Sequence, residues 1–163
     1  MHLSVTTRLD ELRSEITTLA DSSSTAQDLM RSMVKILHDK MLKYNWVGFY
    51  MLEPGARPPM LVLGAFEGAM TPHTRIPLNQ GICGAAASSG QTVVVDDVAK
   101  DSRYLACSLE TKSEIVVPVF AHGKVVGELD IDSHFPAAFT SDHQDFVQHC
   151  AKLVGKKLET AGA

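Results

Sequence analysis

Three carboxylates recur at every second position of one β-rich segment, Val125-Val126-Gly127-Glu128-Leu129-Asp130-Ile131-Asp132. Successive side chains of a strand point to opposite faces, so Glu128, Asp130 and Asp132 are predicted to share one face. Clustered carboxylates raise one another's pKa by repulsion. Such a cluster can hold a ligand ammonium group, or keep one carboxylic acid protonated as a proton donor. The same alternation is also typical of a solvated outer face of a sheet.

The segment just before these carboxylates favours a covered face. Residues 115–120 are apolar at every position, which indicates a strand that is buried on both sides. Glu114 stands at the head of this segment, where a hairpin would bring it opposite Asp130 or Asp132. We therefore expect a carboxylate cluster beneath a lid.

The three cysteines differ in their surroundings. Cys83 lies in the small-residue segment 81–89, where a helix start would favour the thiolate. Cys107 lies in a polar stretch over residues 96–113, and loops longer than about 15 residues are usually functional. Packing as a small apolar residue is the alternative for both thiols. Cys150 falls on the apolar stripe of the last helix, where packing is the expected role. No CxxC pair or zinc-type ligand spacing is present, so no metal site is expected.

Two aromatic residues stand four positions apart in Trp46-Val47-Gly48-Phe49-Tyr50. In a strand, Trp46 and Tyr50 share one face. Aromatic residues at this spacing usually belong to the core, and the wall of a pocket is the alternative.

Periodicity predicts an α+β fold with an antiparallel sheet. Ser24 with Gln27, and Ser141 with Gln144, resemble capping boxes at helix starts. The terminal helices would cover one face of the sheet, and segments 67–91 and 96–113 would wall a pocket on the other. The expected elements are two helices within about 3–43, a short helix at 81–89 and a final helix at about 141–159, with strands at 46–52, 60–66, 92–95, 115–120 and 124–132.

Length and composition fit one domain over residues 1–163. Apolar residues make up 45% of the chain, and the formal net charge is −4 without a basic block. A nucleic-acid or anionic-membrane partner therefore lacks its electrostatic footprint. No apolar run approaches the roughly 20 residues that span a bilayer, and charged residues interrupt the N-terminus where a signal peptide would need an apolar core. These features predict a cytoplasmic protein whose thiols stay reduced unless they react.

Several motifs are distributed along the chain. They are Asn45-Trp46-Val47-Gly48-Phe49-Tyr50, Arg75-Ile76-Pro77, Gly81-Ile82-Cys83-Gly84, Ser113-Glu114-Ile115-Val116-Val117-Pro118 and Leu129-Asp130-Ile131-Asp132-Ser133. Together they resemble the GAF-domain free methionine-R-sulfoxide reductases, over about residues 30–158. The resemblance implies a GAF/PAS-like fold and a thiol enzyme acting on free methionine-R-sulfoxide.

The resemblance also implies roles for particular residues. Cys107 matches the family's nucleophile, which becomes a sulfenic acid that a second cysteine captures as a disulfide. Thioredoxin then reduces this disulfide, so no cofactor is implied beyond an external thiol. Trp46 and Tyr50 match aromatics that cradle the sulfoxide methyl group. The residues that match carboxylates binding the sulfoxide and the substrate ammonium are Glu114, Asp130 and Asp132.

One position departs from the family pattern. Many members carry another cysteine ten residues before the one that matches Cys83, and here this residue is His73. The thiol that captures the sulfenic acid is then Cys83 or a small-molecule thiol. A helix start favours Cys83 as the low-pKa nucleophile, whereas the resemblance favours Cys107, which we follow. A GAF module that senses a small molecule through a partner protein is the alternative function. The sequence leaves the oligomeric state open, with a homodimer among the options.

Overall fold

The computed structural model describes residues 5–104 and 109–161. Four α-helices and a short 3-10 helix flank a single six-stranded sheet. The helices are α1 (Val5–Ser22), α2 (Ala26–Lys40), α3 (Gly81–Ser89), η1 (Val98–Lys100) and α4 (Ser141–Ala161), and the strands are β1 (Trp46–Leu52), β2 (Met60–Glu67), β3 (Arg75–Pro77), β4 (Val93–Val95), β5 (Ser113–Ala121) and β6 (Lys124–Ser133).

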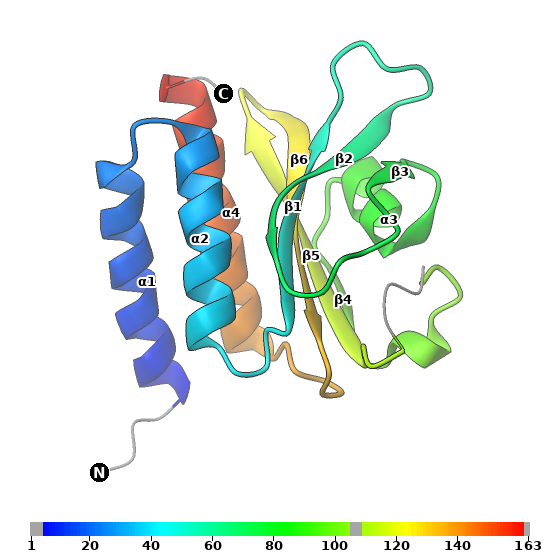
Figure 1. Cartoon of the computed structure of the whole chain (residues 1–163), viewed down its shortest axis with the longest axis horizontal. Coiled ribbons are helices and arrows are strands. Elements are labelled where there is room, and N and C mark those ends of the chain that lie inside the picture. Colours follow the sequence, from blue (N-terminus) through cyan, green and yellow to red (C-terminus); the bar gives the residue numbers. More distant parts are fainter. Residues whose placement is uncertain (1–4, 105–108, 162–163) are drawn as a thin grey trace.

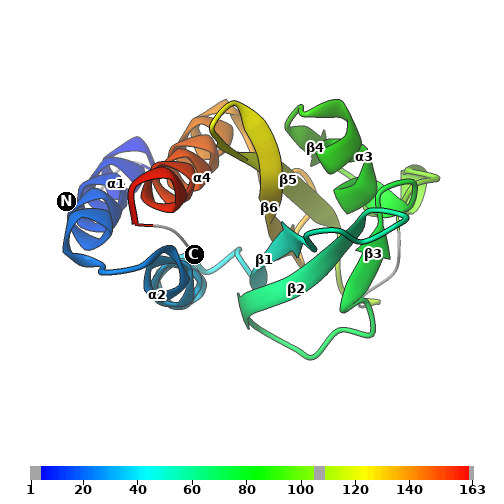
Figure 2. The ribbon, with the colours of Figure 1, turned by 90° about the horizontal axis from the view of Figure 1, so that it is seen from above.

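The strands lie in the order β3-β2-β1-β6-β5-β4, and all neighbouring strands are antiparallel. Helices α2 and α4 cover one face of the sheet, and α3 covers part of the other (Figure 1). Helix α1 packs mainly against α4 and α2 on the side away from the sheet (Figure 2). This arrangement confirms the predicted α+β class, with α1 as an outer layer.

Two hydrophobic cores form because both faces of the sheet are covered. The core on the helical side joins α2 and α4 to sheet residues such as Phe49 and Leu129, both fully buried. The core on the other side joins α3 to Trp46, Tyr50 and Val116. The second core covers the face of β6 that carries the carboxylates. This face is therefore buried, and the alternative of a solvated outer face is wrong.

Some local features differ from the sequence-based expectation. Strand β3 and helix η1 were not predicted. Each is three residues long, and neither carries the run of β-branched residues that marked the equally short strand β4. The cap of α2 is Thr25 and not Ser24, because the Asp28 amide donates to Thr25 Oγ1 at 3.1 Å. At the start of α4, the Gln144 amide donates to the carbonyl of Thr140 at 2.9 Å.

Within residues 5–104 and 109–161, no helix is both long enough and apolar enough to cross a bilayer.

Candidate functional site

The pairing of β5 with β6 assembles the carboxylates. Glu114 lies directly opposite Asp132, and Asp130 is the next residue of β6 on the same face. Their exposed fractions are 5%, 3% and 3% in the order Glu114, Asp130, Asp132. The hairpin therefore brings together the cluster that the alternation predicted, and it does so beneath α3.

Burial sets the protonation of this cluster. Desolvation, followed by the charge of Asp130, raises the pKa values of Glu114 and Asp132 well above the ordinary range. Burial also raises the pKa of Asp130, but hydrogen bonding from Glu114, the Cys83 thiol and Asp132 opposes that shift. Asp130 is therefore the group that most readily carries negative charge, and its neighbours are carboxylic acids that can donate a proton.

Helix α3 brings a thiol to these carboxylates. Cys83 is the third residue of α3, and its Sγ donates to Asp130 Oδ2 at 3.4 Å. Burial raises the pKa of the thiol well above its usual value, and the charges of Asp130, Glu128 and Glu114 raise it further. The helix does begin where the sequence indicated, but burial and the nearby carboxylates raise the pKa of Cys83, so the helix start does not support Cys83 as the low-pKa nucleophile.

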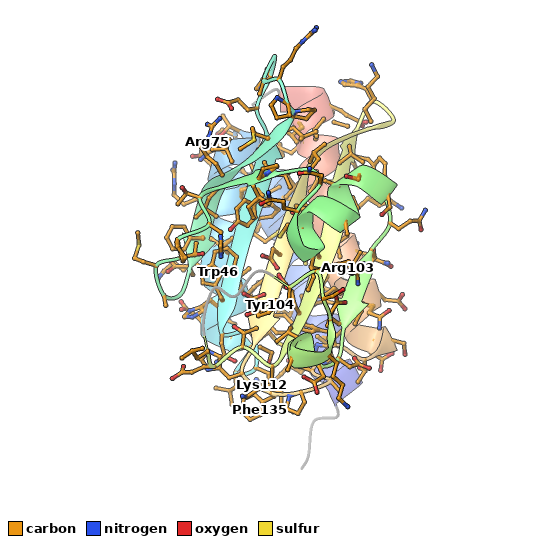
Figure 3. The ribbon with its side chains drawn as sticks, turned by 90° about the vertical axis from the view of Figure 1, so that its right-hand side faces the viewer. Trp46, Arg75, Arg103, Tyr104, Lys112 and Phe135 are labelled. Atoms are coloured by element: carbon orange, nitrogen blue, oxygen red, sulfur yellow. The ribbon has the colours of Figure 1, made fainter. Side chains whose placement is uncertain are left out.

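Aromatic side chains from β1 and β2 form a wall beside the carboxylates. The Trp46 ring stacks on Phe66 with centroids 5.8 Å apart and lies 6.2 Å from the Tyr50 ring. Trp46 Nε1 donates to the carbonyl of Ala69 at 3.0 Å, and the Tyr50 hydroxyl donates to the carbonyl of His73 at 2.7 Å. These bonds fix both rings on the face that carries α3, where Figure 3 shows Trp46.

A small cavity of about 20 Å³ connects the wall, the thiol and the carboxylates. This is room for about one water molecule. Its lining comes from β1, β3, α3, β5, β6 and the segment before β3, and comprises Tyr50, His73, Ile76, Gly81, Ile82, Cys83, Glu114 and Asp130.

Three of these side chains are arranged as a group that could hold a metal ion. Cys83, Glu114 and Asp130 each offer one ligand atom, and these atoms lie within 4.8 Å of one another. Residue spacing did not indicate this group, because the three residues come from three separate elements, α3, β5 and β6.

The other two cysteines have different outcomes. Cys107, the expected nucleophile, lies outside the described residues, so its role stays a prediction. Cys150 is fully buried in the core beneath α4, and burial raises the pKa of its thiol to about 12. Its packing role agrees with its place on the apolar stripe.

Three residues of the site were not among the predicted catalytic or binding residues, although Glu128 was predicted to share the face of Asp130 and Asp132. Glu128 is fully buried on the carboxylate face. His73 lines the cavity and was noted only as a departure from the family. Gly48 leaves space for the Trp46 ring, which a side chain at this position would meet. A glycine inside a strand often marks such a close approach, and that signal was present in the sequence.

The covered sheet, with a pocket facing α3, defines a domain class. The chain matches the family described as "GAF domain" over residues 25–158, and it belongs to that family.

Within the GAF family, two relatives identify the chain as a member of the free methionine-R-sulfoxide reductases. The protein of that name from Escherichia coli is 34% identical over 125 residues, which are 77% of this chain and 73% of that protein. The Saccharomyces cerevisiae protein of that name is 40% identical over 113 residues, which are 69% of this chain and 62% of that protein.

A solved structure gives the same result. The free methionine-R-sulfoxide reductase from Neisseria meningitidis, in complex with its substrate, superimposes with a TM-score of 0.91 at 32% identity. The superposition covers 99% of this chain and 94% of that one. The sensor alternative is not favoured by these relatives.

Proposed function

We propose that this protein reduces free L-methionine-(R)-sulfoxide to methionine with thiols as the electron source. The observation that carries the proposal is the buried cluster of Glu114, Asp130 and Asp132 beside the Cys83 thiol and the Trp46 ring. A sulfoxide reductase needs an acid for the oxygen, an apolar surface for the methyl group and a thiol. Relatives that carry this enzyme name support the same reaction.

The carboxylates act on the two polar ends of the substrate. A protonated Glu114 or Asp132 donates to the sulfoxide oxygen while the S–O bond breaks. The charge of Asp130 attracts the substrate ammonium group, which a methionine inside a peptide lacks. The wall formed by Trp46 and Tyr50 receives the methyl group. The substrate is therefore the free amino acid.

Two thiols complete the reaction. The Cys107 thiolate attacks the sulfoxide sulfur, and the protonated oxygen then moves as a hydroxyl group from that sulfur to the Cys107 sulfur. The bond between the two sulfurs breaks, which releases methionine and leaves Cys107 as a sulfenic acid. The Cys83 thiol attacks this sulfenic acid, which releases water and gives a Cys83–Cys107 disulfide. An external dithiol, with thioredoxin as the proposed partner, restores both thiols by exchange. The sum is one sulfoxide and one dithiol converted to methionine, disulfide and water, without a resident cofactor.

The direct test is an activity assay. The protein is incubated with methionine-R-sulfoxide and dithiothreitol, and methionine is quantified with and without a metal chelator. We expect methionine in both cases and little reduction of methionine sulfoxide within a peptide. Equal activity on the peptide would refute the proposal that the substrate is the free amino acid. Loss of activity with the chelator would indicate that Cys83, Glu114 and Asp130 bind a metal ion.

Cysteine variants separate the two thiol roles. Without reductant, Cys83→Ser should release about one methionine per enzyme, since Cys107 still reacts once, and it should turn over poorly with thioredoxin. Cys107→Ser should release none. The readout is the single-turnover methionine yield, with mass spectrometry of the oxidised protein. A yield from Cys107→Ser but not from Cys83→Ser would reverse the roles.

A further inference from the structure

A thiol and two carboxyl groups meet at one point beneath α3. Cys83, Glu114 and Asp130 each offer one ligand atom there, and all three residues are buried. One sulfur and two carboxylate oxygens form a donor set that suits Zn²⁺, a borderline-soft cation that binds both kinds of atom. Mg²⁺ and Ca²⁺ are instead bound through oxygen atoms. The residue types therefore favour zinc among the common divalent cations.

The separations between the ligand atoms are close to those of a tetrahedral zinc site. Zinc–oxygen bonds of about 2.0–2.2 Å and zinc–sulfur bonds of about 2.3 Å place neighbouring ligand atoms about 3.3–3.7 Å apart. Cys83 Sγ and Asp130 Oδ2 already lie 3.4 Å apart. The other separations do not exceed 4.8 Å. They have to shorten by at most about 1 Å, which side-chain torsions of Glu114 can supply.

Two further observations indicate a ligand at this point. The cavity of about 20 Å³ is lined by all three residues, and it has room for one body the size of a water molecule. Oδ1 of Asp130 is buried and has no hydrogen-bond partner among the described residues. A buried oxygen without a partner is costly. The site thus has the space and the unused bonding capacity that a single ion requires.

The charge of the cluster also favours a cation. The ion pairs between described residues include none of Glu114, Asp130 and Asp132. Buried carboxylates are costly unless a positive charge or a metal ion compensates them. A divalent cation at the cavity would compensate two carboxylates at once.

We propose that the reduced protein binds one Zn²⁺ ion through Cys83 Sγ, Glu114 and Asp130, and that this ion inhibits the enzyme. Water takes the remaining position of the tetrahedron. Coordination replaces the S–H bond of Cys83 by a sulfur–zinc bond and releases the proton to solvent, with no change in oxidation state.

The inhibition follows from what the ion occupies. Zinc covers the carboxylates proposed to bind the substrate ammonium group, so it competes with the substrate. It also holds the thiol that captures the sulfenic acid. This consequence rests on the proposed function, whereas the binding of zinc does not. Since the ion takes no part in the reaction, activity persists in the presence of a chelator.

The binding test titrates the reduced, metal-free protein with Co²⁺ and with Zn²⁺. Cobalt bound to a thiolate shows an intense charge-transfer absorption, which reports the Cys83 sulfur directly, and calorimetry gives the stoichiometry and the Kd of zinc. We expect one ion per chain. Cys83→Ser should abolish the absorption, and it should weaken zinc binding by at least about 10-fold, the lower end of the effect of losing even an outer partner of a metal site.

Two variants separate a built site from a single reactive thiol. Asp130→Asn keeps the thiol and loses a charged ligand, so it should also weaken zinc binding by at least about 10-fold. Cys150→Ser removes a thiol from the helical core and is the matched control, with binding as in the wild type. Thermal melting of each metal-free variant shows that it is folded.

The inhibition test measures methionine release in a single turnover of prereduced protein, without an external thiol, because such a thiol would itself bind zinc. One equivalent of Zn²⁺ should slow the release by at least about 10-fold. A chelator or a higher concentration of methionine-R-sulfoxide should restore the rate.

Each outcome decides one proposal. Cobalt binding without thiolate absorption, or zinc binding in folded Cys83→Ser and Asp130→Asn that is as tight as in the wild type, overturns the zinc site. Zinc binding as expected in a protein that yields no methionine even without zinc overturns the proposed function and leaves the site in place. Tight binding with an unchanged rate of methionine release in the active protein overturns the inhibition.

Discussion

Burial is unfavourable for the carboxyl groups of Glu114, Asp130 and Asp132, since each carboxylate loses its hydration. The cluster is tolerable because its members exchange hydrogen bonds and need not all be charged. The same arrangement leaves Oδ1 of Asp130 and Oδ1 of Asp132 without partners among the described residues. These unpartnered oxygens support the proposal that the cluster binds the substrate ammonium group and donates a proton.

Removing one member of the cluster should therefore lower activity. We expect Asp130→Asn or Glu114→Gln to reduce kcat/KM by about 10²-fold or more, because each removes charge stabilisation or a proton donor. Steady-state kinetics on the free sulfoxide measure this effect, with Asp10→Asn on α1 as control. Values close to wild type for both variants would mean that the cluster has no catalytic part.

Cys150 offers a contrasting test of a buried thiol. Its side chain packs in the helical core, on the far side of the sheet from the carboxylates. We expect Cys150→Ser to leave kcat nearly intact, with a small loss of thermal stability from the buried hydroxyl. A hundredfold loss of kcat in a folded variant, on the scale of a lost catalytic group, would contradict this role.

At the scale of elements, the site depends on how closely α3 approaches the segment before it. A Cβ at Gly84 would lie 2.8 Å from the carbonyl oxygen of Leu78 and 3.1 Å from that of Pro77. Both obstacles are backbone atoms, which cannot rotate away. Gly84 therefore lets α3 hold Cys83 at Asp130.

We expect Gly84→Ala to move α3, to lower the melting temperature and to slow formation of the Cys83–Cys107 disulfide. Overpacking of this kind typically costs about 1–3 kcal/mol. Thermal melting and the single-turnover disulfide assay measure the two effects. Ser89→Ala, on the exposed end of the same helix, is the control. A variant with unchanged melting and disulfide rate would show that α3 is not held this tightly.

At the scale of the whole molecule, the buried carboxyl groups link stability to pH in an unusual direction. A carboxyl group whose pKa is raised by folding binds more protons in the folded state than in the unfolded state. Its contribution to stability is full below the unfolded pKa of about 4 and is lost as pH rises through the folded pKa. Glu114, Glu128 and Asp132 all shift in this direction.

Glu128→Gln should therefore gain stability relative to the wild type as pH rises from about 5 to about 8. A difference of about 1 kcal/mol corresponds to roughly 2–4 °C in melting temperature for a chain of this size. Comparing the two proteins at each pH cancels the opposite effect of His143 and His149, whose pKa values burial lowers. A melting-temperature difference that is constant with pH would contradict the burial of a titrating Glu128.

The sequence was sufficient to predict the family and the covered face that carries the carboxylates. Period-two alternation predicted the shared face of Asp130 and Asp132, and the doubly apolar strand at 115–120 predicted that this face is covered. Combined motifs predicted the family. These inferences succeeded because they depend on local periodicity, which the chain carries at every position.

Other features required the tertiary structure. The pKa of Cys83 depends on Asp130, 47 residues away, and on complete burial, neither of which a helix start reveals. The pairing of Glu114 with Asp132, and not with Asp130, follows from the hairpin register. The unpartnered carboxyl group of Glu128 is visible only once Tyr50 and Pro118 are placed beside it.

The sequence by itself determined the residue types, the strand faces and the family, because these are local properties. The protonation of the site was decided by the fold, since desolvation and charge act through space between groups that are distant in the chain.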